Sequence, residues 1–232
     1  AADIYLTNEY ELFQDKDTEK YGYYGPDGDI AIPAKFDMAD EFLDGLALVM
    51  IGDKYGLIDK TGTAVIPAIY DDISYGIRGN FRDGLTSVKL NGKWGLIDRT
   101  GVMVIPAIYD EVAYFSEGLL AVCIDNKWGF VNAAGEPVIP VKYDDVFEFE
   151  DGYCSVKLNE KHGMIDTTGR EVVPIIYDFV GGFHDGYFNM RVDGKWGYVD
   201  VMGKVVVQPI YDETHYFREG LAPVRVGAKW GY

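Results

Sequence analysis

Hydrophobic and polar residues alternate over short stretches of this chain, and the alternation recurs at a fixed spacing. After Gly84, the second, fourth and sixth residues are Thr86, Val88 and Leu90, and Lys89 stands between the last two. After Gly118 and Gly186 the same even positions hold Leu120, Val122 and Ile124, then Phe188, Met190 and Val192. A period of two predicts a half-buried β-strand. No stretch shows the 3.6-residue period of a helix.

Turn signals separate this first strand from two further strands. Asn91-Gly92 follows it, and Asn-Gly favours a two-residue hairpin because both residues accept positive φ. A second strand of the form aromatic-Gly-apolar-apolar-acid comes next, and its glycine predicts a bulge or a close approach of the neighbouring layer. Asp98–Gly101 then predicts a type I turn ending in glycine. The third strand, Val104-Ile105, is followed by Pro106, which stops pairing or lies at a sheet edge.

The whole set is repeated along the chain. The aromatic-Gly pairs begin at Tyr21, Tyr55, Trp94, Trp128, His162, Trp196 and Trp230. They advance by 34 residues, except for one step of 39. The turn glycines, the aromatic-Asp pairs such as Tyr109-Asp110, and the Phe-x-acid-Gly series keep the same steps, which indicates a repeat architecture. The five extra residues fall within 73–80, so that segment is expected to be a surface loop.

These motifs resemble those of the bacterial WG-containing repeat family, also called KWG repeats. The resemblance runs from about Tyr21 to Tyr232 and rests on the aromatic-Gly, acid-x-x-Gly, Val-Ile-Pro, Tyr-Asp and Phe-x-Glu-Gly series. The chain departs from the pattern at the Trp position of the first two copies, at His162 and at Gln208-Pro209. The resemblance implies no general enzymatic activity and a role as a binding or scaffold module.

The predicted fold is therefore all-β, built from tandem 34-residue units of three antiparallel strands. An open twisted solenoid, in which each unit contacts its neighbours, competes with a six-bladed β-propeller; the short unit favours the solenoid. Residues 1–20 are expected to form an atypical N-terminal cap, with strand from Tyr10–Phe13 before a turn at Asp15–Lys20. Residues 21–232 form a single array of about six WG-type units, expected to continue beyond Tyr232 in the parent protein.

Composition excludes several classes of function. The formal charge of -17 repels phosphate backbones, so nucleic acid is not an expected partner. No apolar run approaches the about 20 residues of a membrane span. The two cysteines, Cys123 and Cys154, lie at opposite strand parity after their glycines, so no disulfide is expected between them. Cys154 is predicted to be a core residue and Cys123 the more accessible one.

The recurrent aromatic and polar residues are predicted to be structural. One large ring per unit can fill the gap between stacked units, so the four tryptophans are expected to pack rather than bind a ligand. The Asp of each Tyr-Asp pair is expected to accept nearby backbone N–H groups in an Asx-type turn. His162, in a Trp position, is expected to pack as a ring, and His184 and His215 come from successive units. No metal ligand set and no cofactor motif is found.

Five residues are the candidates for a binding contact. Tyr75, Arg78 and Arg82 belong to the insertion and its flank, which is unusually cationic for this chain. Tyr114 and Tyr216 precede the loop phenylalanine of their units. The residues at that position, namely Glu41, Asn80, Tyr114, Glu148, Gly182 and Tyr216, vary from copy to copy while the surrounding frame is constant. A position that varies while the residues around it stay constant is typical of a recognition surface.

Three functions follow in order of preference. The first is a non-catalytic module that presents an extended repeat surface to protein partners. The second is carbohydrate or cell-envelope binding, suggested by the 18 tyrosines together with abundant acids. The third is a glycoside hydrolase with a carboxylate pair, which a sequence with 38 acidic residues cannot specify. A bacterial secreted, periplasmic or surface location is slightly favoured.

Overall fold

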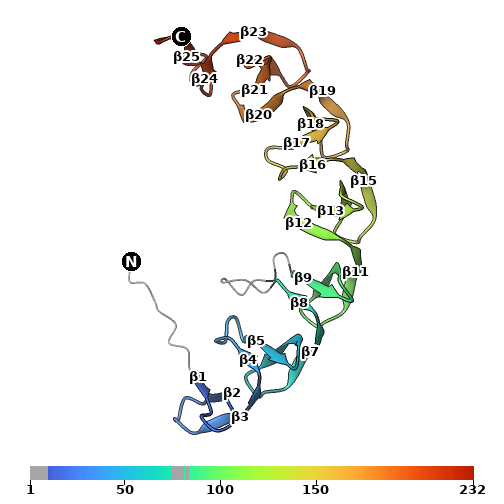
Figure 1. Ribbon diagram of the computed structural model, residues 1–232, viewed down its shortest axis with the longest axis vertical. Coiled ribbons are helices and arrows are strands. Elements are labelled where there is room, and N and C mark those ends of the chain that lie inside the picture. The colour runs from blue at the N-terminus through green and yellow to red at the C-terminus, as the bar shows by residue number, and fades with distance from the viewer. Residues whose placement is uncertain (1–9, 75–80, 82–83) are drawn as a thin grey trace. The chain divides into compact units, whose positions relative to one another are not determined.

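A computed structural model describes residues 10–74, 81 and 84–232 of the chain, and in them every regular element is a β-strand (Figure 1). The chain forms two compact units, Ala1–Asp110 and Glu111–Tyr232. Tyr75 and Arg78, with Arg82, lie outside the described residues, as does most of the insertion. The predicted all-β repeat architecture is confirmed.

The first unit contains three antiparallel sheets, which we call A, B and C. Sheet A consists of β1 (Glu11–Gln14), β2 (Tyr21–Tyr24) and β3 (Ile30–Phe36). Sheet B consists of β4 (Met38–Ala39), β5 (Leu46–Ile51), β6 (Lys54–Asp59) and β7 (Ala64–Tyr70). Sheet C consists of β8 (Asp72–Ile73), β9 (Leu85–Leu90), β10 (Lys93–Asp98) and β11 (Met103–Tyr109).

The second unit contains sheets D to G. Sheet D consists of β12 (Glu111–Ser116), β13 (Leu119–Ile124), β14 (Lys127–Asn132) and β15 (Pro137–Tyr143). Sheet E consists of β16 (Asp145–Val146), β17 (Tyr153–Leu158), β18 (Lys161–Asp166) and β19 (Glu171–Tyr177). Sheet F consists of β20 (Phe179–His184), β21 (Tyr187–Val192), β22 (Lys195–Asp200) and β23 (Val205–Tyr211). Sheet G consists of β24 (Glu213–Thr214), β25 (Val224–Val226) and β26 (Lys229–Gly231).

Five sheets have four strands, so the expectation of three per unit is wrong. The additional strand is the first of each sheet and lies between the aromatic-Asp pair and the Phe-x-acid-Gly motif, where the sequence predicts only a loop that links two units. In sheet E it is two residues long, and Asp145 and Val146 pair with Lys157 and Val156 of the next strand. Two residues are too few to show a period, and in sheets D and F a register shift interrupts the six-residue first strand.

The hydrophobic core lies between successive sheets rather than within any one of them. In the second unit, Phe130, Ile139 and Tyr143 of sheet D pack with Phe149, Cys154 and Val156 on the sheet E side. Met164 and Val173 of sheet E pack in the same way with Phe188 and Met190 of sheet F. In β13 the residues Leu119, Leu120, Ala121, Val122 and Cys123 are all buried. Cys123 is 3% exposed, so the expectation that it is the accessible cysteine is wrong; both thiols are free and buried.

The turn predictions are confirmed by the backbone geometry. Asn91 and Gly92 have φ of 53° and 79°, as a type I′ hairpin turn requires. The Asp98–Gly101 turn closes with a hydrogen bond from Gly101 N–H to the Asp98 carbonyl, at 3.0 Å. Asp98 Oδ1 also accepts the N–H groups of Thr100 and Val102. At the N-terminal turn Asp15 accepts from Thr18 in the same manner, after the strand β1 that the sequence predicts.

The aromatic-Gly strand is the third strand of each four-stranded sheet. Its glycine lets the fourth strand of the same sheet approach closely, whereas a close approach of the next sheet was also possible from the sequence. A Cβ atom on Gly197 would lie 2.4 Å from the carbonyl oxygen of Val207 and 2.8 Å from the nitrogen of Pro209, both in β23. The register of β22 and β23 shifts at this point, between Trp196 and Tyr198. The fourth strand therefore bulges over the glycine, and its proline lies on the outer edge of the sheet.

In five of the aromatic-Asp pairs the aspartate does not form a local Asx turn; it joins two successive sheets of the same unit. Asp178 follows the last strand of sheet E, and its Oδ1 accepts a hydrogen bond of 2.6 Å from Lys161 Nζ of the same sheet. Its Oδ2 accepts the Asp193 N–H of the hairpin turn in sheet F, at 2.7 Å. The same pair of contacts is made by all five residues that we call the joining aspartates, namely Asp37, Asp71, Asp144, Asp178 and Asp212.

The lysines of these pairs stand directly before the aromatic-Gly motif. This explains why lysine recurs at positions 20, 54, 127, 161 and 195, and Lys93 forms an ion pair with Asp110 in the same way. The hydrogen bonds from Lys161 and then from the Asp193 N–H hold the pKa of Asp178 below its ordinary value. The carboxylate is therefore ionised throughout the neutral range, where it can accept both bonds.

The tryptophans are half-buried rather than core residues. Trp94 and Trp196 each pair with the tyrosine of the fourth strand, Tyr109 or Tyr211. Lys89 Nζ lies 5.7 Å from the ring centroid of Trp94, and cation–π contacts of this kind are favourable at the surface. The large buried rings are instead the tyrosines of the Tyr-Asp pairs, such as Tyr143 at 0% exposure. His162 packs as a ring, as predicted, with its centroid 5.9 Å from that of Phe179.

We expect Gly197→Ala to destabilise the chain by about 1–3 kcal/mol, because β23 must move to admit the methyl group. Thermal unfolding followed by circular dichroism measures the effect. Gly231→Ala is the matched control, since Gly231 is the equivalent residue of sheet G and a Cβ atom there meets nothing within 4 Å. Equal unfolding midpoints for the two variants would contradict the close-approach explanation.

We expect Asp178→Asn to lower the unfolding temperature at pH 7, because the charged bond to Lys161 is lost. Since the folded pKa of Asp178 is depressed, its stabilisation is complete above the unfolded pKa of about 3.9 and disappears as the pH falls through the folded value. The difference in midpoint between wild type and variant should thus be constant from pH 8 to 5 and shrink below about pH 4. Asp185→Asn, an exposed turn residue, is the control; the same pH profile for both variants would refute the assignment.

Candidate functional site

The structure places two of the five predicted contact residues. Tyr114 lies on β12 of sheet D, and Tyr216 follows β24 of sheet G. They occupy equivalent positions of different sheets, so they do not form one site with each other. The cationic insertion is outside the described residues and stays a prediction. Tyr216 is therefore the residue from which a site can be built.

Tyr216 reaches from sheet G onto sheet F. Its ring centroid lies 4.3 Å from that of His184. A Cβ atom on Gly182 would lie 2.6 Å from a carbon of the Tyr216 ring, and Gly182 has φ of +66°. Glycine at 182 is thus required both by the backbone conformation and by the space that the tyrosine ring takes. About half of the Tyr216 surface, 48%, is exposed.

A cleft of about 310 Å³ opens between these two sheets. We call it the F/G cleft, and its lining residues are Phe179, Gly181, Gly182, Asn189, Trp196, Thr214, His215 and Tyr216. Phe179 and Trp196 meet edge to face, with centroids 5.6 Å apart. The Arg191 guanidinium lies 5.5 Å from the Trp196 centroid and covers that ring from sheet F. The cleft therefore has aromatic walls supplied by both sheets.

Two polar side chains lie inside this aromatic frame. Asn189 is 9% exposed, and its Nδ2 donates to Thr214 Oγ1 at 3.0 Å. The backbone beside them is held by the Tyr198 hydroxyl, which donates to the His215 carbonyl at 2.6 Å. Burial raises the pKa of Tyr198, so this hydroxyl keeps its proton and remains a donor. The polar groups of the cleft are positioned by contacts that cross from one sheet to the next.

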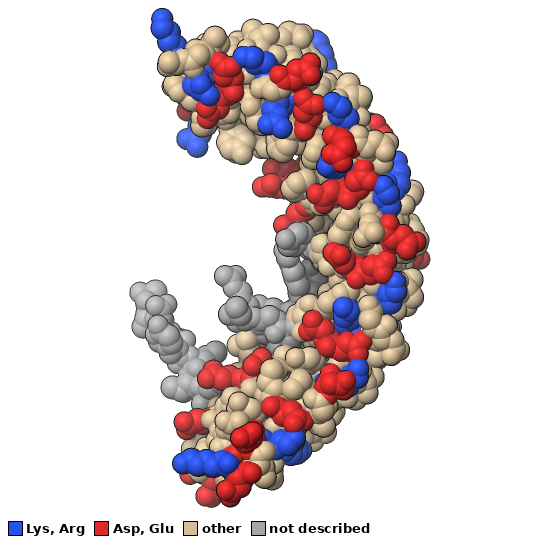
Figure 2. Space-filling model, viewed as in Figure 1, with Lys and Arg blue, Asp and Glu red and all other residues tan. Residues whose placement is uncertain are grey.

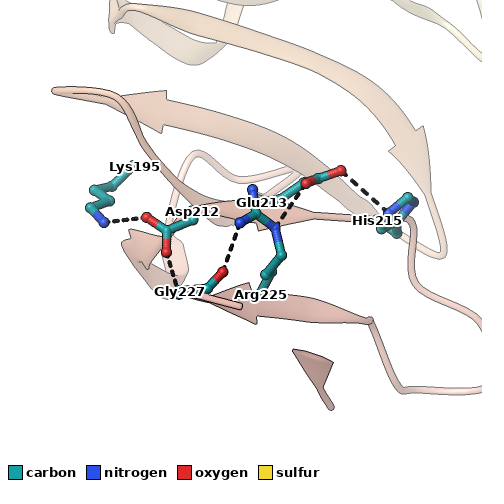
Figure 3. Close-up of polar contacts among 6 residues, drawn as sticks. All are labelled: Lys195, Asp212, Glu213, His215, Arg225 and Gly227. Atoms are coloured by element: carbon teal, nitrogen blue, oxygen red, sulfur yellow. Dashed lines mark hydrogen bonds and ion pairs between the residues drawn. The ribbon is translucent and has the colours of Figure 1, made fainter. Parts of the chain in front are cut away.

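Charged residues near the cleft are paired with one another (Figure 3). Glu213 Oε2 accepts from Arg225 Nε at 3.0 Å, and its Oε1 lies 3.8 Å from His215 Nε2. Arg225 also donates to the Gly227 carbonyl at 2.8 Å. Asp212 joins Lys195 to the Gly227 N–H beside this group. Among the described residues that line the F/G cleft, none is a carboxylate, a lysine or an arginine.

The preceding joint has a smaller cleft of about 200 Å³ between sheets E and F, which we call the E/F cleft. Ser155 lies there at the position equivalent to Asn189, and its hydroxyl donates to the Val180 carbonyl at 2.9 Å. Val180 and Gly182 stand at the positions of Thr214 and Tyr216. Both clefts have aromatic walls, and Phe179 lines both. The E/F cleft adds the carboxylates of Glu148 and Glu150, whereas the F/G cleft has the amide of Asn189 and the hydroxyl of Thr214.

A larger hollow of about 940 Å³ lies on sheet G and shares His215 and Tyr216 with the F/G cleft. It is lined in part by Trp230, Gly231 and Tyr232, beside β26. In sheet F the equivalent Tyr198 is 1% exposed, whereas Tyr232 is 84% exposed. In sheet F, the fourth strand covers the surface that is equivalent to this hollow.

The described residues give little support for metal binding. No group of three or more His, Cys, Asp or Glu side chains within them could hold a metal ion. The three histidines lie in different sheets and each contacts an aromatic ring, namely Phe179, Tyr216 and Trp230. The described part of the chain contains no helix that could cross a membrane.

Sequence reasoning found Tyr216 but missed Asn189, Thr214 and the two glycines at 181 and 182. A usable signal was present, because these residues depart from their equivalents in the other repeats. Ser87 and Ser155 stand at the position of Asn189 in earlier copies. Reading the repeats as aligned columns, and looking for several departures in one joint, would have selected the F/G cleft.

Comparison with solved structures gives only distant similarity. Kluyveromyces lactis Hsv2 is 8% identical over 84% of this chain and 71% of its own, with a TM-score of 0.39. A eukaryotic initiation factor is 11% identical over 94% of this chain and 78% of its own, with a TM-score of 0.42. PorZ of Porphyromonas gingivalis, described as a surface component of the type-IX secretion system, is 9% identical over 94% of this chain and 34% of its own, with a TM-score of 0.37. Similarity at this level indicates no function.

Comparison with known sequences is more informative. No curated protein matches the chain. The profile of the WG-containing repeat matches six consecutive segments, 21–55, 55–94, 94–128, 128–161, 163–196 and 196–230. These boundaries coincide with the aromatic-Gly pairs from which the repeat was first recognised. The chain belongs to the WG-containing repeat family.

Proposed function

We propose that this chain is a non-catalytic binding module that presents the joints between its sheets to protein partners. The observation that carries the proposal is the contrast between a constant frame and a variable position. Each joining aspartate makes the same two contacts, whereas the position before the loop phenylalanine holds Glu41, Glu148, Gly182 or Tyr216. A repeated frame that varies one exposed position can be adapted to a partner without loss of the fold.

The surface charge supports a partner with basic patches. Asp and Glu side chains are spread along both units and interspersed with Lys and Arg (Figure 2). The formal charge of -17 produces an overall negative potential, which accelerates encounter with a positively charged surface and disfavours acidic ones. Association with such a partner is expected to weaken as salt concentration rises.

The lining of the F/G cleft supports the absence of catalysis. A glycosidase needs two carboxylates across the cleft, about 5–9.5 Å apart. None of the described lining residues is a carboxylate or a cysteine. The Thr214 hydroxyl accepts from Asn189, which is no general base.

Carbohydrate binding is the second candidate, in which the partner is a glycan of the cell envelope. The aromatic walls and neutral polar groups of the F/G cleft favour it, because rings stack on the apolar faces of sugars while amides and hydroxyls bind their hydroxyl groups.

We further propose that the sheets form an open solenoid rather than a closed six-bladed propeller. The described residues form seven sheets, one more than six blades require. Each sheet is built from a short repeat of 34 residues in all but one case, as in arrays whose modules contact only their neighbours.

Small-angle X-ray scattering tests the open array. A compact chain of this length has a radius of gyration of about 17 Å, whereas an open array should give a clearly larger value at all protein concentrations. A radius of about 17 Å with a globular scattering profile would instead indicate the closed propeller.

Site-specific photo-crosslinking tests the protein-binding function. A photoreactive phenylalanine is placed at Glu148, at Tyr216 or at Met202, and the protein is irradiated in an extract of the organism that makes it. Met202 is the control because it is 83% exposed and lies in the turn between β22 and β23, away from the first strands of the sheets. We expect discrete crosslinked proteins from positions 148 and 216 and none from 202. Equal yields at all three positions, or no product, would contradict the proposal.

A further inference from the structure

We propose that the F/G cleft is a binding site for a neutral oligosaccharide. The inference rests on the second candidate function above and assigns it to one place in the molecule. It concerns the joint between β20 of sheet F and β24 of sheet G, with Tyr216, Asn189 and Thr214 as the residues that recognise the sugar.

The aromatic residues provide stacking surfaces at two sides of the cleft. Tyr216 is supported from behind by His184, at 4.3 Å between centroids, and 48% of its surface is exposed. Phe179 and Trp196 are fixed against each other in sheet F, and Arg191 holds the Trp196 ring in addition. Rings that are held in this way lose little freedom on binding, and they match the C–H faces of a pyranose.

The polar residues provide hydrogen bonds of both kinds. Asn189 has two amide N–H donors and a carbonyl oxygen, and its bond to Thr214 uses one of the donors. The Thr214 hydroxyl is both a donor and an acceptor. Sugar hydroxyls also donate and accept. A cleft with a few placed polar groups among aromatic side chains is the usual form of a small-molecule site.

The absence of formal charge in the described lining selects a neutral ligand. Two charged residues beside the cleft, Glu213 and Arg191, stand outside the lining set. Glu213 is paired with Arg225, and the Arg191 guanidinium lies over the Trp196 ring. A cationic ligand would gain from a carboxylate in the cleft and an anionic one from a lysine or arginine. An uncharged polyhydroxylated ligand needs neither.

The E/F cleft differs from the F/G cleft in its polar lining. It is also aromatic, with Phe147, Tyr153 and Phe183, but it has two carboxylates, Glu148 and Glu150. At the equivalent positions it has Ser155, which is bonded to the Val180 carbonyl, with Val180 and Gly182 in place of the threonine and tyrosine. Its volume of about 200 Å³ is smaller than the about 310 Å³ of the F/G cleft.

Isothermal titration of the whole chain with chitotetraose, cellotetraose and maltotetraose tests the proposal. We expect saturable one-site binding of at least one of them. Tyr216→Ala should weaken it at least 10-fold, and Asn189→Ser, which copies the E/F cleft, about 5-fold or more. Met202→Ala, far along the sheet edge and 83% exposed, should leave affinity unchanged. Unfolding midpoints of the variants verify that each remains folded.

The possible failures are distinguishable. If wild type binds none of the three oligosaccharides, the site and the carbohydrate function both fail. If wild type binds but Tyr216→Ala binds equally well, the site is wrong while carbohydrate binding stands. Binding of choline chloride in place of the sugars would overturn the inference by showing that the rings form a cation site. Binding with the expected losses, alongside an unchanged Met202→Ala, establishes it.

Discussion

A single carboxylate connects two successive sheets at each joint within the two units, and the arrangement of the sheets within each unit depends on it. The joining aspartate leaves the last strand of one sheet, accepts a lysine from that sheet and accepts a backbone N–H from the hairpin turn of the next. These bonds are partly exposed, so each is weak by itself. Their effect is geometric, because they fix the turn of one sheet against the edge of another and thereby determine which apolar surfaces meet.

Those apolar surfaces are what stabilises the chain. No sheet has a core of its own; Phe130 and Tyr143 of one sheet need Phe149 and Val156 of the next. Burial of such side chains contributes roughly 1.5–3 kcal/mol each, far more than any one ion pair. The joints are therefore the places where stability is concentrated, and the repeats depend on one another as in other arrays of short modules.

The same joints are also where the chain can acquire function. The joining aspartates and the buried rings hold the sheets together, which leaves the loop after the first strand free to vary. In the F/G cleft, glycine at 182 makes room for Tyr216, and asparagine at 189 replaces a serine whose hydroxyl is bonded to backbone in the preceding joint. Several residues that differ from their equivalents in the other repeats thus lie in one cleft, while the strands and the contacts of the joining aspartate stay the same.

The family, the period, three strands of each sheet and the turn types could be predicted from the sequence, because these depend on local patterns such as Asn91-Gly92 and Val88 beside Lys89. Tyr216 could likewise be recognised as a variable position. The folded chain was needed to show that Asp178 accepts hydrogen bonds from Lys161 and Asp193, that Gly197 lies against the adjacent strand, and that a two-residue strand completes sheet E. Each of these contacts joins residues about 10 to 17 positions apart in the sequence. The alternation of hydrophobic and polar residues predicts which face of a strand a side chain lies on, but not which distant residue it contacts.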